Sequence, residues 1–198
     1  MRALAPFVRM MDNISERLGW LSTMIVIGTV AIGFYNVAAR YLGRFIGVQL
    51  SSNVFIEMQW YMYSLVFFFG FAYLLKNGGN VRVDFIYADW PKKRKARLDF
   101  WGHLLFLVPF CLLGIYVTYN PILTSWGLQA NGTWGAWEMS PDAGGLPRAP
   151  IKTMMIVAFT VLLFQTFAEL IKLLAILRDE EDQLGFEQVE SDAPLRIE

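Results

Sequence analysis

The sequence predicts an all-α integral membrane protein with four transmembrane helices, short interfacial helices and both termini on the inner side. Three observations support this fold class. Of the 198 residues, 56% are hydrophobic and only 17% are charged, against about a quarter charged in an average soluble domain. Four stretches long enough to cross a bilayer carry at most one charge each. Lysine and arginine are concentrated in alternate connecting segments.

The composition also excludes several kinds of chemistry. A single cysteine, Cys111, cannot form an internal disulfide, a cysteine-rich zinc site or a redox pair. A single histidine, His103, cannot give a haem two imidazole ligands. The 17 basic and 17 acidic residues balance, so the basic excess typical of nucleic-acid binding is absent. We therefore expect no enzyme activity, no cofactor or metal site and no nucleic-acid partner.

Four spans follow from the distribution of charges, because a hydrocarbon core of about 30 Å requires about 20 apolar helical residues. The first span could instead be a cleaved signal peptide, with Val37 and Ala39 at cleavage-like spacing. Its apolar run exceeds the usual length of about 7–15 residues, so we expect an uncleaved anchor. The predicted spans are residues 19–39, 58–75, 100–119 and 153–171.

Aromatic and basic residues set the position and orientation of these spans. Each of the seven tryptophans falls at a predicted helix end or in a connecting loop, where an amphipathic ring is most stable. With both termini inside, 13 lysines and arginines lie on the inner side and 4 on the outer side. The reverse orientation would violate the positive-inside rule. We therefore expect a multi-pass membrane protein with both termini in the cytoplasm.

Two segments next to the first span have amphipathic or apolar character. Residues 3–17 mix apolar and charged side chains, which fits either a short interfacial helix or an ordinary N-terminal extension. The outer loop 41–56 begins with an apolar half that we expect to lie on the membrane or against a partner. Its Ser51-Ser52-Asn53 run is expected to cap the second span.

The outer surface contains the charged side chains most suited to holding segments together. Glu57 opens the second span, where a helix N-terminus favours a carboxylate, and we expect it to pair with Arg40 or Arg44. The long outer loop 120–150 is rich in tryptophan and glycine and shows no clear periodicity. It is predicted either to dock a soluble partner or to cap the helix ends.

On the inner side, the loop 76–98 contains an Asn-Gly-Gly-Asn break followed by Val81-Arg82-Val83-Asp84. Asp84 is a plausible N-cap of a short interfacial helix that Pro91 ends or bends. The basic run at 92–95 is interpreted as a topology determinant facing the anionic leaflet. Residues 176–198 form an acidic cytoplasmic tail that is predicted to be solvated and largely disordered beyond about residue 184.

Within the spans, polar groups are few. Glu169 lies near the inner end of the fourth span and is expected to pair with Lys172 at the i+3 position. Asn36 and Gln165 are neutral polar groups of the kind that join helices in a bundle. A path for a polar solute needs ionisable groups near the bilayer centre, and such groups are almost absent. The chain by itself is therefore not expected to transport a solute.

Several short motifs resemble the small membrane subunit (Q-type, DctQ-like) of tripartite ATP-independent periplasmic (TRAP) transporters. The resemblance extends over about residues 10–175, and the stretch from Gly70 to Asp84 is its most specific part. The motifs are Asn36-x-x-x-Arg40-Tyr41, Glu57-x-x-Trp60, Gly70-x-Ala72-Tyr73-x-x-Lys76-x-Gly78-x-x-Val81-Arg82-Val83-Asp84, Pro147-x-x-Pro150-Ile151-Lys152 and Gln165.

The resemblance implies partners that perform the transport. In this family a periplasmic substrate-binding protein captures an organic acid and delivers it to a small and a large (M-type) membrane subunit. The large subunit is understood to hold the sodium and substrate sites, and the small subunit to widen the scaffold and help dock the binding protein. The candidate interface residues are Asn36, Arg40, Glu57, Trp60, Arg82, Asp84, Trp134, Trp137, Glu138, Arg148, Lys152 and Gln165.

Two alternatives belong to other functional classes. The chain could be the membrane anchor of a respiratory quinone-linked enzyme, in which its many aromatic side chains lie near a quinone or a haem. His103 would then be the only imidazole ligand available. A self-sufficient small transporter or channel is the third reading, and the missing polar path counts against it.

Overall fold

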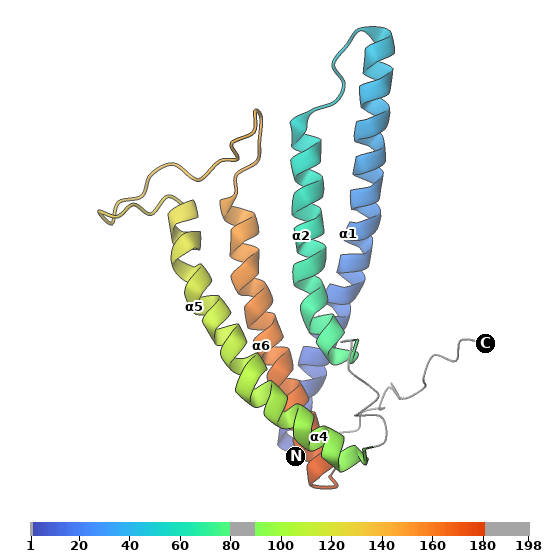
Figure 1. Cartoon of the computed structure of the whole chain (residues 1–198), viewed down its shortest axis with the longest axis vertical. Helices are drawn as coiled ribbons and strands as arrows, with labels where there is room; N and C mark the ends of the chain where they lie inside the picture. Colours follow the sequence, from blue (N-terminus) through green and yellow to red (C-terminus); the bar gives the residue numbers. More distant parts are fainter. Residues whose placement is uncertain (1, 80–89, 181–198) are drawn as a thin grey trace, which may run out of the picture.

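The computed structural model describes residues 2–79 and 90–180. Four helices in this part of the chain are long and apolar enough to cross a membrane, which confirms the predicted all-α fold class (Figure 1). Arg82, Asp84 and the acidic tail beyond residue 180 lie outside the described residues. The helical elements are η1 (Arg2–Leu4), α1 (Ala5–Ile46), α2 (Asn53–Lys76), α4 (Lys92–Gly102), η2 (His103–Leu107), α5 (Val108–Ser125) and α6 (Ala149–Leu177).

The first helix is longer than the predicted span at both ends. Residues 3–17 do not form a separate interfacial helix, because α1 runs without a break from Ala5 to Ile46. Val8 and Met11 in this N-terminal part pack against Ala168 of α6. This apolar contact, together with the absence of proline between residues 7 and 46, explains why the helix continues instead of turning into the membrane interface.

The third crossing is a single long helix made of α4, η2 and α5, and the predicted span 100–119 lies within it. Its η2 segment is a π-helical turn in which the Val108 N–H bonds to the His103 carbonyl. Pro109 follows directly, and a proline has no N–H to offer the carbonyl four residues earlier. The wider turn accommodates that loss within a continuous helix.

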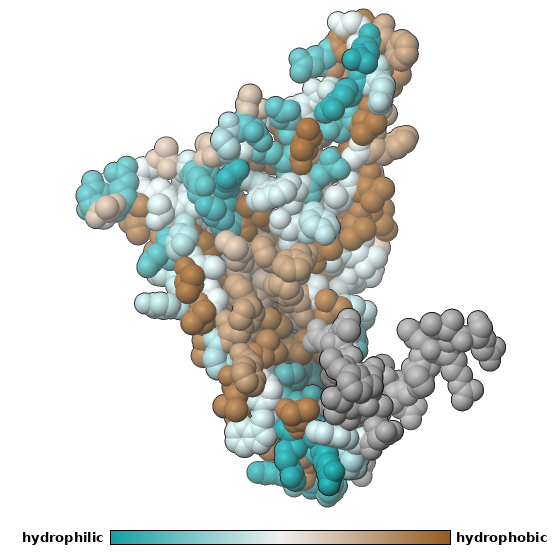
Figure 2. Space-filling model, viewed as in Figure 1, coloured by the Kyte–Doolittle hydropathy of each residue, from teal (hydrophilic) through white to brown (hydrophobic). Residues whose placement is uncertain are grey.

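The fourth helix, α6, lies at the centre of the bundle. It packs against α1, α2, α5 and the α4–η2 segment, and Figure 1 shows it between α5 and α2. Leu162 of α6, Leu75 of α2 and Cys111 of α5 form a buried cluster where three helices meet. Most remaining apolar side chains face outward, and Figure 2 shows them gathered over the middle of the bundle, with hydrophilic residues at its ends.

The first two helices form a hairpin with small residues at its crossing. Gly19 lies against the ring of Tyr73, and the Ser22 hydroxyl donates a 3.0 Å hydrogen bond to the Val66 carbonyl. Small residues let two backbones approach closely inside a membrane. As predicted, the Ser-Ser-Asn run caps the second helix: the Ser52 side chain accepts a bond from the Val54 N–H.

Candidate functional site

The segment between α5 and α6, residues 126–148, is called here the tryptophan loop. It is tied to one face of α2 by three side chains that lie four residues apart. The Asn53 amide donates to the Ala143 carbonyl at 3.4 Å. The Glu57 carboxylate accepts hydrogen bonds from the Ser140 hydroxyl and the Leu146 N–H. The Tyr61 hydroxyl donates to the Pro147 carbonyl at 2.8 Å.

A second set of bonds ties the tryptophan loop to the ends of α5 and α6. Lys152 Nζ lies 2.5 Å from Glu138 Oε2 and 2.8 Å from the Ser125 hydroxyl. The Ser125 hydroxyl also donates to Glu138 Oε2 at 2.6 Å. The bond from Lys152 and then the bond from Ser125 hold the pKa of Glu138 below its ordinary value. A carboxylate in the loop is therefore bound by both neighbouring helices.

Aromatic side chains complete this attachment. Trp126 donates its indole N–H to the Thr153 hydroxyl at 2.8 Å and packs edge-on against Trp137, with ring centroids 4.7 Å apart. Trp134 and Trp137 remain about half exposed or more. Two isolated β-bridges, Leu128 to Trp134 and Met139 to Pro147, shape the loop further. The loop is thus a folded structure that presents tryptophan rings outward.

The predicted pairing of Glu57 with an arginine does not occur. Both carboxylate oxygens of Glu57 bind the tryptophan loop, and no ion pair joins Glu57 to Arg40 or Arg44 in the part of the chain that the structure describes. The α1 helix continues past Arg40 to Ile46, so both arginines remain exposed on α1. Loop residues distant in sequence therefore take the place of the predicted partners.

The other predicted interface residues occupy different surroundings. Asn36 is buried on α1, with no hydrogen-bond partner for its Oδ1 among the described residues. Trp60 is exposed on α2. Arg148 is the N-cap residue of α6, and its N–H bonds to the Glu138 carbonyl at 2.9 Å. Glu57, Glu138, Arg148 and Lys152 are thus brought together at one end of the bundle, whereas Gln165 lies toward the other end.

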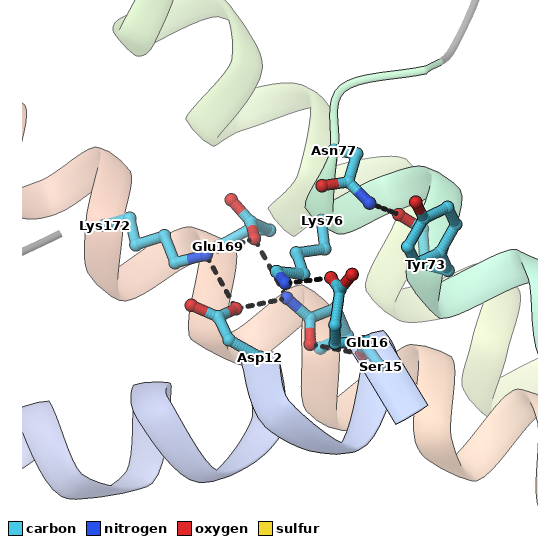
Figure 3. Close-up of polar contacts among 9 residues, drawn as sticks. Asp12, Ser15, Glu16, Tyr73, Lys76, Asn77, Glu169 and Lys172 are labelled. Carbon is cyan, nitrogen blue, oxygen red and sulfur yellow. Dashed lines mark hydrogen bonds and ion pairs between the residues drawn. The ribbon is translucent and has the colours of Figure 1, made fainter. Parts of the chain in front are cut away.

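A second polar group, called here the Lys172 cluster, joins α1 to α6 near the opposite end of the bundle (Figure 3). Lys172 Nζ lies 2.8 Å from both Asp12 Oδ1 and Glu169 Oε1. The Gln165 amide donates to the same two carboxylates at 3.0 Å, and Gln165 Oε1 accepts a 2.7 Å bond from the Ser15 hydroxyl. The predicted Glu169–Lys172 pair is confirmed.

Sequence reasoning did not identify Asp12 and Ser15 as members of this cluster. A signal for Ser15 was present in the helical spacing of the residues on the buried face of α1, which include Val8, Met11, Ser15 and Gly19. Asp12 is only partly buried and lies outside that spacing. The same region contributes a neighbouring ion pair between Glu16 and Lys76 of α2, 2.5 Å apart. Charged groups of α1 therefore hold the helix to two others.

These arrangements join the helices to one another and to the tryptophan loop. No group of three histidine, cysteine, aspartate or glutamate side chains in the described residues is arranged to hold a metal ion. The polar side chains that hold the tryptophan loop, and those of the Lys172 cluster, bind one another or the backbone.

Comparison with known proteins identifies the family. No curated protein and no solved structure matches the chain. Residues 29–176 match the family described as "Tripartite ATP-independent periplasmic transporters, DctQ component". The match includes all of α2, α5 and the tryptophan loop, and nearly all of α6. This chain belongs to the DctQ family, the small membrane component of TRAP transporters, and is a multi-pass membrane protein.

Proposed function

We propose that this chain is the scaffold subunit that supports the large permease subunit of a sodium-coupled TRAP transporter and helps dock its periplasmic substrate-binding protein. It lies in a bacterial inner membrane with both termini in the cytoplasm. The transported compound is an organic acid, such as a dicarboxylate. The sodium and substrate sites belong to the large subunit, and this chain requires no cofactor of its own.

The observation that carries this proposal is the attachment of the tryptophan loop at two places. Glu57 holds it to α2, and Glu138 holds it to Ser125 and Lys152 on α5 and α6. A long loop fixed in this way loses conformational freedom before any partner arrives, which reduces the entropic cost of docking. Its exposed Trp134 and Trp137 are of the residue type that most often anchors protein interfaces.

The proposed orientation has a basis in both sequence and structure. The start of α1 and the end of α6 lie at the same end of the bundle (Figure 1), and 11 of the 15 basic residues in the described ranges belong to segments on that side. The positive-inside rule then assigns this end to the cytoplasm. The tryptophan loop faces the periplasm, where a substrate-binding protein can reach it.

The proposal is tested by uptake in proteoliposomes that contain this chain, the large subunit and the binding protein. The Glu57→Ala variant removes an acceptor of two loop bonds. We expect uptake to fall at least tenfold while the two membrane subunits still copurify. Asp142→Ala is the matched control, because it removes an exposed carboxylate of the same loop, and it should leave uptake unchanged. Full uptake by Glu57→Ala would contradict docking through this loop.

A second variant separates docking from loop folding. Replacing both Trp134 and Trp137 by alanine removes exposed rings and leaves the bonds of Glu57 and Glu138 in place. We expect a higher half-saturating concentration of binding protein, with the maximal uptake rate unchanged. An unaltered dependence of uptake on the concentration of binding protein would exclude the tryptophan loop as the docking site.

The same uptake assay tests the proposed sodium coupling. Uptake that does not depend on the sodium gradient would exclude it.

A further inference from the structure

The loop that joins α1 to α2 borders an open hollow of about 300 Å³ that no part of the proposed docking surface uses. It is lined by Arg40, Gly43 and Arg44 of α1 and by residues 47–51 of the loop. The two arginines are four residues apart, so their guanidinium groups lie on one face of the helix. This hollow is called here the arginine pocket.

The shape of the pocket depends on a tight backbone turn. Gly47 ends α1 with a φ of 76°, in the left-handed region that favours glycine. The Val48 N–H then bonds back to the Gly43 carbonyl at 3.0 Å. A side chain at position 43 would overlap the Val48 carbonyl. The sequence Gly43–Gly47 thus folds the loop back over the helix and leaves a space beside the arginines.

Both arginines carry a full positive charge that nothing in the described part of the chain neutralises. Each is exposed, and neither makes an ion pair or side-chain hydrogen bond with another described residue. Glu57, the acidic residue expected to pair with them, is bound to the tryptophan loop instead. The N–H donors of an arginine guanidinium group suit phosphate oxygens, so two arginines that line one hollow favour a phosphate group as its ligand.

The surroundings of the pocket are apolar. Tyr41, Phe45, Ile46 and Val48 are all more than half exposed, and Phe45 reaches 87%. They continue the outward apolar stripe of α1 that includes Val30, Phe34 and Val37. Because this stripe begins in the membrane-spanning part of the helix, the side chains around the pocket continue the surface that faces lipid.

The depth of the pocket agrees with the position of lipid headgroups. The uncharged stretch from residue 18 to residue 39 is 22 residues long and measures about 33 Å as a helix. This length matches the hydrocarbon core of about 30 Å. Arg40 is therefore the first charged residue beyond the core, at the level where phosphate groups of the leaflet lie, whichever end of the bundle faces the cytoplasm.

We propose that the arginine pocket binds the phosphate of an anionic phospholipid, with the surrounding apolar side chains in contact with its acyl chains. Arg40 and Arg44 supply the charge, and the 47–51 turn supplies the wall against which the headgroup rests. The bound lipid would cover the exposed end of the α1–α2 hairpin. This site is separate from the tryptophan loop, so it does not depend on the docking proposed above.

Native mass spectrometry of the full-length purified chain tests the proposal with phosphatidylglycerol as the probe. Replacing both Arg40 and Arg44 by glutamine should weaken binding of this lipid about tenfold. The matched control replaces Arg9 and Arg17 by glutamine, which removes the same charge from the opposite end of the same helix. The control variant should bind as the wild type does. Replacing Arg40 and Arg44 by lysine, which keeps the charge but not the planar fork, should restore part of the affinity.

Three outcomes would overturn the proposal. Equal affinity in the wild type and the glutamine double variant would show that the pocket binds no lipid. An equal loss in the Arg9 and Arg17 control would show attraction to overall charge only. Competition by inorganic phosphate as strong as that of phosphatidylglycerol would assign the pocket to a free anion. Circular dichroism and gel filtration of each variant verify that it is folded.

Discussion

Ser15 of α1 donates a 2.7 Å hydrogen bond to Gln165 of α6, and both side chains are fully buried although they are 150 positions apart in the sequence. The bond joins the N-terminal part of the chain to its last helix. Gln165 also donates to Asp12 and Glu169, so one side chain connects three others. Inside a bundle in lipid, a buried amide of this kind fixes how two helices pack.

Replacing Gln165 by leucine should lower the free energy of unfolding by about 1–3 kcal/mol, because the Ser15 hydroxyl loses its acceptor and two carboxylates lose a donor. Unfolding by SDS in mixed micelles measures this change. The double variant with Ser15→Ala isolates the single bond, for which we expect a coupling of about 0.5–1 kcal/mol. Strict additivity would show that the bond contributes nothing to stability.

Lys172 should be far more important for stability than Lys76. It lies 2.8 Å from two carboxylates, Asp12 and Glu169, whose side chains are at most 19% exposed. Lys172→Met would leave both buried without a cation, at a cost of about 3–5 kcal/mol. The Glu16 side chain that faces Lys76 is 57% exposed, so water replaces the lost partner in Lys76→Met, and we expect a change of at most about 1 kcal/mol.

Thermal unfolding of the two variants in detergent measures the difference. A further variant that combines Lys172→Met with Asp12→Asn and Glu169→Gln removes the unpaired charges and should recover much of the lost stability. Equal destabilisation by Lys172→Met and Lys76→Met would show that the Lys172 cluster contributes no more to stability than the exposed Glu16–Lys76 pair.

The fold and the site differ in how far the sequence predicts them. Membrane spans follow from local composition, since a lipid environment requires about 20 consecutive apolar residues, and each predicted span lies within an observed helix. The Glu169–Lys172 pair was also predictable, because both residues lie on one helix three positions apart. Local spacing alone determines such contacts.

The partners of Glu57 were not predictable in the same way. They lie 83 and 89 positions away, in a loop without periodicity, and their approach depends on how α2 packs beside α6. The sequence interpretation chose the nearest opposite charges, Arg40 and Arg44. Because α1 continues to Ile46, those arginines remain exposed on the helix. A count of nearby charges does not predict where a helix ends or which way its side chains point.

Acid should release the tryptophan loop at Glu138. Hydrogen bonds from Lys152 and Ser125 hold the pKa of this carboxyl below its ordinary value of 4.5. A group whose pKa is lower in the folded state stabilises that state at pH values above its unfolded pKa. The contribution is therefore complete above about pH 4.5 and is lost as the pH falls through the lowered pKa.

Tryptophan fluorescence measures this release, because Trp126 and Trp137 are in contact within the loop. The wild type should show a spectral change with its midpoint below pH 4.5. The Glu138→Gln variant should lack it, whereas Asp142→Asn, which alters an exposed acid of the same loop, should retain it. A transition that persists unchanged in Glu138→Gln would mean that another group controls the loop.

Two glycines that both lie in transmembrane helices should respond oppositely to alanine. At Gly19 an added methyl group would overlap the ring of Tyr73, so α1 and α2 must separate or the ring must move. We expect Gly19→Ala to destabilise the hairpin by about 1–3 kcal/mol. At Gly70 an added methyl group meets no atom within 4 Å, and removing a helical glycine favours the helix by up to about 1 kcal/mol.

Unfolding of the two variants in the same detergent provides the comparison, since each adds one methyl group to a membrane helix. The opposite signs follow from the helix crossing at Gly19, which the Ser22 bond to Val66 also stabilises. If the Gly19→Ala variant were as stable as the Gly70→Ala variant, the result would contradict the close approach of α1 and α2 at Gly19. If Gly70→Ala instead abolished copurification with the large subunit while preserving stability, this face of α2 would be the surface against which the large subunit packs.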